Sequence, residues 1–250
     1  MITAHRALKA AGKYVSRGIL AAKAALGVRA GRHCTACGRD VVGFFRYGDC
    51  ADWGCPACQA SPRERLVNYL IDGAILTLPA EDGAILHMAP GEASLVTRFR
   101  TAVCDYVPAD LDPSRYAVAG MHRIDLMDID ERGRFDLFYA SHVMEHVPDD
   151  AHVLREIFAA LNPGGEAWLI VPLWDKPTED GRPGMSARER EKRFGQWDHV
   201  RQYGPDFADR IRAAGFDVEV LRASDQPASE VIRLGLGEMV FRARKPLARG

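Results

Sequence analysis

Residues 134–172 read RFDLFYASHVMEHVPDDAHVLREIFAALNPGGEAWLIVP and contain the pattern that decides the fold. The apolar run at 135–140 has the length of a buried strand, and 167–171 forms a second such run. Between them, apolar residues at helical spacing predict a helix: Val153, Leu154, Ile157, Phe158 and Leu161. The Asn-Pro-Gly-Gly sequence at 162–165 is expected to end that helix. Strand, helix and strand at this spacing predict a βαβ unit and therefore a parallel sheet.

The length and composition are those of a globular protein with an uneven charge distribution. At 250 residues the chain can hold one full α/β domain and a small appendage. No apolar run approaches the length that spans a bilayer. Residues 1–39 hold eight Lys/Arg and no Asp or Glu, whereas the remaining residues hold 25 Lys/Arg and 34 Asp/Glu. The basic N-terminal segment and the acidic remainder are therefore considered separately.

The N-terminal segment has the pattern of an amphipathic basic helix, apolar along one line and cationic on the opposite side. The apolar line comprises Leu8, Val15, Ile19, Ala22 and Leu26, and the cations are Arg6, Lys9, Lys13 and Arg17. This helix can pack on the protein's own body, or residues 1–28 can contact anionic lipid peripherally at the inner face of the membrane. A partner helix or an organellar transit peptide are further alternatives. Basic residues interrupt every candidate secretory core, so we expect a cytoplasmic protein.

The six cysteines form one ordered cluster and two isolated positions. The cluster consists of two CxxC pairs separated by 17 residues: Cys34, Cys37, Cys55 and Cys58. This spacing predicts a zinc ribbon, and a zinc ion held by four thiolates is structural. Two disulfides in a secreted protein are the alternative, which the lack of an evident signal peptide disfavours. Cys50 and Cys104 are expected to be ordinary thiols, and His33 is surplus to the zinc site.

Three segments are expected along the chain. Residues 1–30 form the basic helix, 31–62 form the zinc ribbon, and 63–250 form the main α/β domain. Within the main domain, a polar insertion at about 174–204 follows the fifth strand. Its position near the carboxyl edge of the sheet is that of a lid or a substrate platform.

The stretches FDL, SHVMEHVPD and LNPGG follow one another between residues 135 and 165. In this order they resemble the fourth and fifth strands of class I S-adenosylmethionine-dependent methyltransferases. Together with the CxxC pairs and with LHMAP, TED, FGQWDHVRQYG and AAGF, they are similar to a bacterial subgroup of this family over residues 34–222. The resemblance implies a Rossmann-like α/β sheet, mostly parallel with an antiparallel C-terminal edge strand, and a site for S-adenosylmethionine.

The loop after the expected first strand, at 84–88, is where the resemblance places the methionine part of the cofactor. Most family members have a G-x-G-x-G turn there, whereas this chain keeps one glycine between two alanines. Small residues partly meet the need for a backbone that approaches the cofactor closely. The resemblance therefore implies cofactor contacts at four loop residues: Ala89, Pro90, Gly91 and Glu92.

The resemblance implies further cofactor contacts at the ends of the next strands. Asp110 at the end of the second strand would hold the ribose hydroxyls, and Asp105 is the competing choice. Asp125 and Leu126 in the loop after the third strand would contact adenine. Two residues at the end of the fourth strand are also assigned to the cofactor: Ser141 and His142.

Two histidines and an acid follow the fourth strand, at the edge where open α/β sheets bind ligands. His142, Glu145 and His146 are spaced i, i+3 and i+4, so one helical turn would bring them together. The spacing is similar to the metal-binding residues of ubiquinone-pathway O-methyltransferases, which implies a second, divalent metal as one alternative. In the others, Glu145 and His146 brace the strand–helix junction, or His146 acts as a catalytic base.

The sequence DHVRQY at 198–203 gathers an acid, an imidazole, a guanidinium and a phenol within the polar insertion. We predict that His199 is the base that removes the proton of a hydroxyl acceptor, with Asp198 as its orienting acid. Substrate contacts are predicted for three residues of the same stretch: Trp197, Arg201 and Tyr203.

These patterns predict a methyltransferase that modifies a hydroxyl of a small-molecule or glycan acceptor, such as a lipid-linked sugar. RNA or another nucleic acid is the alternative acceptor, because a zinc ribbon and a basic helix can hold phosphate. The acidic remainder of the chain disfavours a broad phosphate-binding surface. The alternative that is not an enzyme is a binding module that keeps the methyltransferase fold without the cofactor.

Overall fold

The chain folds into two compact units, and the computed structural model describes residues 2–247, with side chains from residue 11 onward. The first unit comprises Met1–Thr77, Glu92–Leu95 and Arg222–Met239, and the second comprises Leu78–Gly91, Val96–Leu221 and Val240–Gly250. The predicted ribbon segment, 31–62, thus shares its unit with residues on either side of it and with a distant C-terminal segment.

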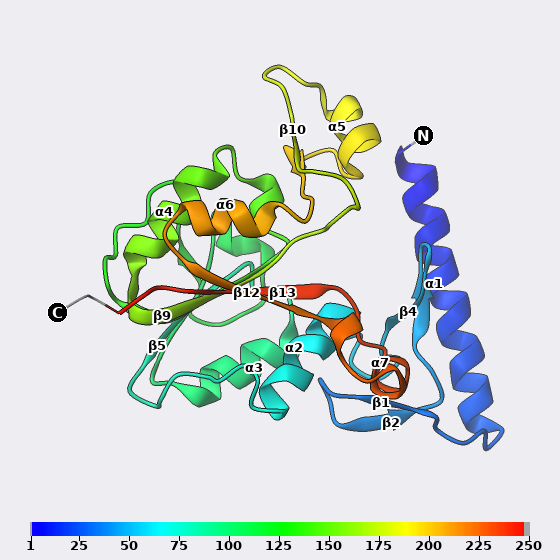
Figure 1. The fold of residues 1–250 in the computed structure, drawn as a ribbon. Coiled ribbons are helices and arrows are strands. Elements are labelled where there is room, and N and C mark those ends of the chain that lie inside the picture. Colours follow the sequence, from blue (N-terminus) through cyan, green and yellow to red (C-terminus); the bar gives the residue numbers. More distant parts are fainter. Residues whose placement is uncertain (1, 248–250) are drawn as a thin grey trace. The chain divides into compact units, whose positions relative to one another are not determined.

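The first unit contains the cysteine-rich segment, three helices and two hairpins. Its elements are α1 (Ile2–Ala25), β1 (Arg32–Cys34), β2 (Arg39–Val41), β3 (Phe45–Tyr47), β4 (Cys50–Gly54), α2 (Pro62–Asp72), the 3-10 turn η3 (Ala223–Asp225) and α7 (Ala228–Leu234). β1 pairs with β2 and β3 with β4, both antiparallel. Figure 1 shows α1 running beside the second hairpin. Within residues 2–247, no helix combines the length and the apolar character needed to cross a bilayer.

A buried arginine explains why α2 and α7 belong to the unit of the cysteines. The Arg65 side chain on α2 is fully buried, and its guanidinium donates to five backbone carbonyls. These acceptors are the oxygens of Asp52, Trp53, Ala60, Leu234 and Gly235. A single side chain therefore joins the cysteine-rich segment, α2 and the end of α7 through charge-assisted hydrogen bonds.

The second unit is built on a seven-stranded sheet in the order β12–β13–β9–β8–β5–β6–β7. The strands are β5 (Ala84–Met88), β6 (Asp105–Asp110), β7 (His122–Arg123), β8 (Phe135–Ser141), β9 (Leu161–Ile170), β12 (Asp217–Arg222) and β13 (Met239–Arg244). β5 to β9 pair in parallel, and β13 runs antiparallel to β9. This arrangement confirms the predicted Rossmann-like sheet with an antiparallel strand near its C-terminal edge.

Helices and short turns connect these strands. They are α3 (Ala93–Ala102), η1 (Pro113–Arg115), η2 (Met144–His146), α4 (Asp150–Ala160), α5 (Ala187–Phe194) and α6 (Phe207–Ala213), with the two-residue strands β10 (Glu179–Asp180) and β11 (Arg201–Gln202). Figure 1 shows α4 and α6 together on one face of the sheet. Met88 pairs with Ala109 and with Ala140, so β5, β6 and β8 end at the same edge. The loops that follow these strands are thereby brought together.

The Asn-Pro-Gly-Gly sequence does not form a separate turn. α4 ends at Ala160 and β9 begins directly at Leu161, with an irregular register against β8. A Cβ on Gly165 would lie 2.9 Å from the Asn162 carbonyl oxygen, so only glycine fits this close approach. The glycines therefore lie inside the start of the strand, and Leu161, which was predicted on the helix, is the first residue of β9.

Candidate functional site

A pocket of about 350 Å³ opens at the carboxyl edge of the sheet in the second unit. Its walls come from the segments after β5, β6, β7 and β8 and from the turn at 196–198. This edge is where open α/β sheets bind their ligands. The predicted site residues that line it are Ala89, Asp110, Asp125, Leu126, His142, His146 and Asp198.

Ala89 adopts a backbone conformation that favours glycine. Its φ is +49°, in the left-handed region, and its N–H donates to the Ala109 carbonyl at 2.8 Å. The Gly91 N–H in turn donates back to the Ala89 carbonyl. A left-handed non-glycine residue is strained by about 1 kcal/mol. The loop thus keeps the sharp turn that a glycine usually makes, although the family glycine is absent.

Asp110 ends β6 on the wall of the pocket. Its Oδ1 accepts from the Asp112 N–H at 2.8 Å, which fixes the carboxylate at the strand end. Burial and the neighbouring Asp110 carboxylate raise the pKa of Tyr116, another lining residue, to about 12. The competing residue Asp105 begins the same strand and forms an ion pair with Arg134 at 3.1 Å. Asp105 therefore lies at the end of β6 that is remote from the pocket.

The loop after β7 supplies the adjoining wall. Asp125 Oδ1 accepts from the Met127 N–H at 2.9 Å, and Leu126 is buried beside it. Asp125 and Leu126 thus lie side by side on one wall of the pocket, as the predicted contacts to the flat adenine ring require.

Four of the predicted cofactor residues are not among those that line this pocket: Pro90, Gly91, Glu92 and Ser141. Glu92 belongs to the first unit, where its carboxylate lies 3.0 Å from Arg63 Nε. Pro90 is buried and Ser141 is half-buried at the end of β8. Gly91, two residues after the strained Ala89, is exposed.

His146 and Asp198 meet on the wall of the pocket. His146 Nδ1 lies 3.6 Å from Asp198 Oδ2, and both side chains are about one-third exposed. Asp198 Oδ1 also accepts from the Gln196 side-chain amide at 2.7 Å. The acid that was predicted to orient His199 is therefore positioned against His146.

His199 is buried directly behind His146, with 4.8 Å between the ring centres. Its Nδ1–H donates to the Phe194 carbonyl at 3.0 Å, and its Nε2 lies 4.0 Å from the buried Glu145 carboxylate. Burial, and secondly the charge of His146, lower the pKa of His199. Glu145, His146 and His199 each offer an atom within 4.8 Å of the others, so this cluster has the residue types of a metal site.

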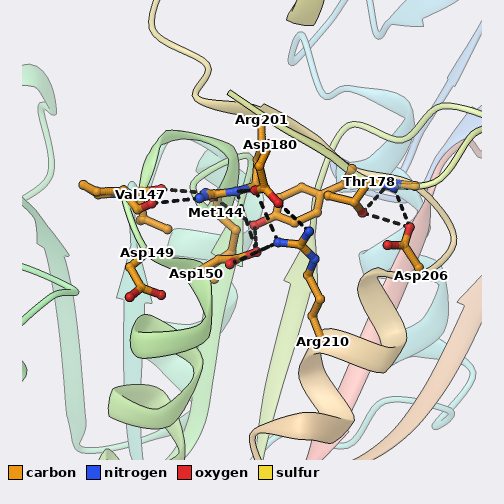
Figure 2. Close-up of polar contacts among 12 residues, drawn as sticks. Met144, Val147, Asp149, Asp150, Thr178, Asp180, Arg201, Asp206 and Arg210 are labelled. Carbon is orange, nitrogen blue, oxygen red and sulfur yellow. Dashed lines mark hydrogen bonds and ion pairs between the residues drawn. The ribbon is translucent and has the colours of Figure 1, made fainter. Parts of the chain in front are cut away.

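The predicted substrate residues Arg201 and Tyr203 are both buried. Figure 2 shows the polar network around Arg201. The Arg201 guanidinium bonds to Asp180 at 2.9 Å and to backbone carbonyls of the loop after β8: Met144, Val147 and Pro148. The Tyr203 hydroxyl lies 3.0 Å from the Asp150 carboxylate. Both side chains thus hold the loop that carries His146. Trp197 is exposed outside the pocket lining.

Sequence reasoning missed several lining residues, among them Arg115, Tyr116, Met127 and Gln196. Residues 115 and 116 lie in an irregular connection that has no periodic pattern. Gln196 lies within the stretch that was singled out, but glutamine is common on surfaces and gives no distinct signal. Only the fold reveals that these side chains face one pocket.

The four cysteines of the CxxC pairs come together in the first unit, within 4.8 Å of one another. The Sγ atoms of Cys34 and Cys58 are 3.7 Å apart, and those of Cys37 and Cys55 are 3.9 Å apart. A tetrahedral zinc with bonds of about 2.3 Å requires sulfur atoms about 3.8 Å apart. The thiols therefore fit a structural zinc ion with no open coordination position.

We expect the protein to contain one zinc ion per chain, measured by elemental analysis after dialysis. Cys58→Ser should abolish that stoichiometry, because three thiolates and a hydroxyl bind zinc weakly. Cys50→Ser, at an exposed cysteine outside the cluster, is the matched control and should retain the metal. Full zinc content in Cys58→Ser would contradict the site.

Comparison with known proteins adds a sequence family and a set of related folds. A family profile described as "Methyltransferase domain" matches residues 63–220. No curated protein matches the chain. Among solved structures it is similar to that of the cyclase SpnF, with a TM-score of 0.54 and 14% identity over 74% of this chain and 82% of that one. It is also similar to a structure of the Trm112 methyltransferase activator complex from Haloferax volcanii, with a TM-score of 0.50 and 15% identity over 71% and 89% of the two chains.

Proposed function

The chain belongs to the class I S-adenosylmethionine-dependent methyltransferases, and we propose that it methylates a hydroxyl group of a small-molecule or glycan acceptor. The observation that supports this acceptor is the His146–Asp198 pair, which shares one pocket with the predicted ribose ligand Asp110. A hydroxyl must lose its proton as it is methylated, and a histidine beside an acid suits that task.

The proposed mechanism assigns one role to each member of the pair. When bound, S-adenosylmethionine supplies a methyl group on a positively charged sulfur. Asp198 faces His146 Nδ1 and favours the proton on that atom, which leaves Nε2 to receive the acceptor's proton. Ala89, Asp110, Asp125 and Leu126 would hold the cofactor, which would give its methyl group to the acceptor oxygen and leave as S-adenosylhomocysteine. His146 then carries the proton until it passes to water.

Arg201 and Tyr203 act, in this proposal, as positioning residues rather than as substrate contacts. The Arg201 guanidinium is engaged with the β8–α4 loop and with Asp180 (Figure 2). The Tyr203 hydroxyl is engaged with Asp150. His199 supports the His146 ring from behind through its bond to the Phe194 carbonyl. This arrangement fixes the base in one orientation before the acceptor binds.

A divalent metal is the competing use of this cluster, held by Glu145, His146 and His199, with His199 in the place that was predicted for His142. It would orient the acceptor hydroxyl directly and would occupy His146 as a ligand instead of as a base. Titration of the zinc-loaded protein with Mn²⁺ or Mg²⁺ distinguishes the base mechanism from the metal mechanism. If His146 is the base, the added ion should neither bind at a second site nor change turnover.

A nucleic-acid acceptor and a non-catalytic module remain the alternative functions. RNA binding that weakens steeply with salt would favour the former. Failure to bind S-adenosylmethionine and S-adenosylhomocysteine would favour the latter. The single glycine in the loop after β5, where most family members have a G-x-G-x-G turn, motivates this second alternative, because the fold alone does not fix the reaction.

We expect S-adenosylhomocysteine to bind with one-to-one stoichiometry, and Asp110→Asn to weaken its affinity about tenfold by removing a charged acceptor for the ribose hydroxyls. Asparagine keeps an oxygen for the Asp112 N–H, so the local turn is retained. Asp105→Asn, on the same strand but remote from the pocket, is the matched control. Calorimetric titration measures both, and equal losses in the two variants would refute the assignment of Asp110.

The lipid-linked subclass of acceptor is proposed from the basic N-terminal helix, residues 1–28. A helix that holds the enzyme peripherally on a membrane would present it to acceptors that cannot leave the lipid. An acceptor screen that follows S-adenosylhomocysteine release should therefore compare a water-soluble sugar with the same sugar on a lipid anchor.

A further inference from the structure

The N-terminal helix packs on the protein with its basic side. The Lys13 ammonium lies 5.4 Å from the Phe45 ring centre and the Arg17 guanidinium 5.7 Å from the same ring, on β3. Between them, the Ser16 hydroxyl accepts from the Arg46 N–H at 3.0 Å. The long stems of these cations cover the aromatic hairpin, which is a normal use of amphipathic side chains.

The apolar line of α1 therefore faces away from the hairpin. Val15 is 63% exposed and Ile19 is 52% exposed, and Leu26, directly after the helix, is 82% exposed. Ala22, which continues the line, is also exposed, and the side chain of Leu8 lies outside the described part. The expectation that the apolar line packs on the protein's own body does not match these exposed side chains. A row of exposed large apolar side chains marks an interaction surface.

A groove of about 600 Å³ lies beside α1 within the first unit, and the exposed line Val15, Ile19, Ala22 and Leu26 is not among the residues that line it. α1 and the cysteine-rich segment form its walls, mainly with apolar side chains: Tyr14, Leu20, Ala24, Val28, Val41 and Pro56. Tyr14 is 67% exposed at its edge. The apolar surface thus extends beyond a single helical line.

The charge of this segment decides between the candidate occupants. Residues 1–39 carry eight cations and no acid, so two copies that paired through α1 would bring like charges together. A nucleic acid would contact cations and would leave the apolar line uncovered. An anionic lipid surface meets both features, because its acyl region accepts apolar side chains and its headgroups attract the exposed cations Lys23 and Arg29.

We propose that the outward face of α1, formed by Tyr14, Val15, Ile19, Ala22 and Leu26, docks on a membrane that contains anionic lipid. The purpose of this docking, the presentation of a lipid-linked acceptor, rests on the proposed function, whereas the docking itself does not. Docking is measured without turnover, so a chain that binds vesicles and has no methyltransferase activity separates failure of the function from failure of the inference.

The test uses the full-length, zinc-loaded protein and its sedimentation with vesicles. The vesicles contain phosphatidylcholine either alone or mixed with phosphatidylglycerol. The variant combines Val15→Gln, Ile19→Gln and Leu26→Gln, which keep the charge and suit a helix. Ile232→Gln on α7 is the matched control, because Ile232 is 61% exposed in the same unit. Circular dichroism and S-adenosylhomocysteine binding establish that each variant is folded.

We expect the wild-type protein and Ile232→Gln to bind the mixed vesicles equally, and the triple variant to bind at least about tenfold more weakly. Binding should fall with added salt and be much weaker on phosphatidylcholine alone. Equal binding by the triple variant and the wild type would overturn the proposal. Failure of the wild-type protein to bind either kind of vesicle would also overturn it. The same holds if the wild-type protein does not bind vesicles and is a dimer that the triple substitution dissociates.

Discussion

His146→Ala should lower turnover about a hundredfold or more, and should leave the affinity for S-adenosylhomocysteine unchanged. The imidazole lies on the wall of the pocket beside Asp198, where it can receive the proton that the acceptor hydroxyl loses. Without it, the proton must pass to water as the methyl group moves. The measurement pairs the rate of S-adenosylhomocysteine release with calorimetric titration of the same variant.

Two further variants test the assignment of the base. Asp198→Asn removes the charge that orients His146 and should lower turnover about tenfold, with little change in the Michaelis constant. His199→Asn keeps a donor near the Phe194 carbonyl and should have a smaller effect than His146→Ala. If His199→Asn abolished turnover and His146→Ala did not, His199 would be the base, and the mechanism proposed for His146 would be wrong.

The parts of the fold that were predictable are those in which local pattern and burial agree. The expected first strand, 84–88, coincides with β5, and all five of its residues are buried. A continuous apolar run is what a strand covered on both faces requires, so the pattern identifies a central parallel strand. The mostly parallel sheet with an antiparallel strand near its C-terminal edge was implied by the resemblance to the family, whereas the order of its strands was not predicted.

Tertiary contacts explain what the sequence could not reveal. A helical wheel separates the apolar line of α1 from its basic side, but it does not indicate which side packs on the aromatic hairpin. In the same way, the polar density of 198–203 predicted a site without separating its members. Asp198 faces the pocket, whereas Arg201 turns inward to backbone carbonyls. A guanidinium that binds a ligand and one that binds the fold are identical residues in a sequence.

Arg65 is the strongest example, because it lies in the run Arg-Glu-Arg, which is typical of a solvated helix face. In the structure it is fully buried against Phe44, whose ring centre is 3.8 Å from the guanidinium carbon. Burial lowers the pKa of the guanidinium, while the thiolates of Cys34 and Cys55 oppose that shift. Four thiolates around one zinc ion carry a net negative charge, so a bound metal centre would compensate this buried cation.

Arg65→Ala should therefore reduce the free energy of unfolding of the first unit by about 3–5 kcal/mol. The substitution removes the donors to five carbonyls and opens a cavity beside Phe44, and each buried acceptor that loses its partner is destabilising. Because the same carbonyls belong to the cysteine-rich segment and to the end of α7, the variant should also release zinc to a chelator faster. Urea unfolding followed by tryptophan fluorescence measures the first effect, and a colorimetric zinc assay measures the second.

Two matched substitutions separate the geometry of Arg65 from its charge. Arg65→Lys keeps the charge but has three donors on a single nitrogen, which cannot reach all of the carbonyls that surround the edge of the planar guanidinium. It should recover part of the stability and little of the zinc retention. Arg188→Ala, at an exposed arginine of α5, should change stability by less than about 0.5 kcal/mol. If Arg65→Ala unfolded at the same urea concentration as the wild type, the prediction would be wrong. Interactions other than the hydrogen bonds of Arg65 would then hold the cysteine-rich segment, α2 and α7 together.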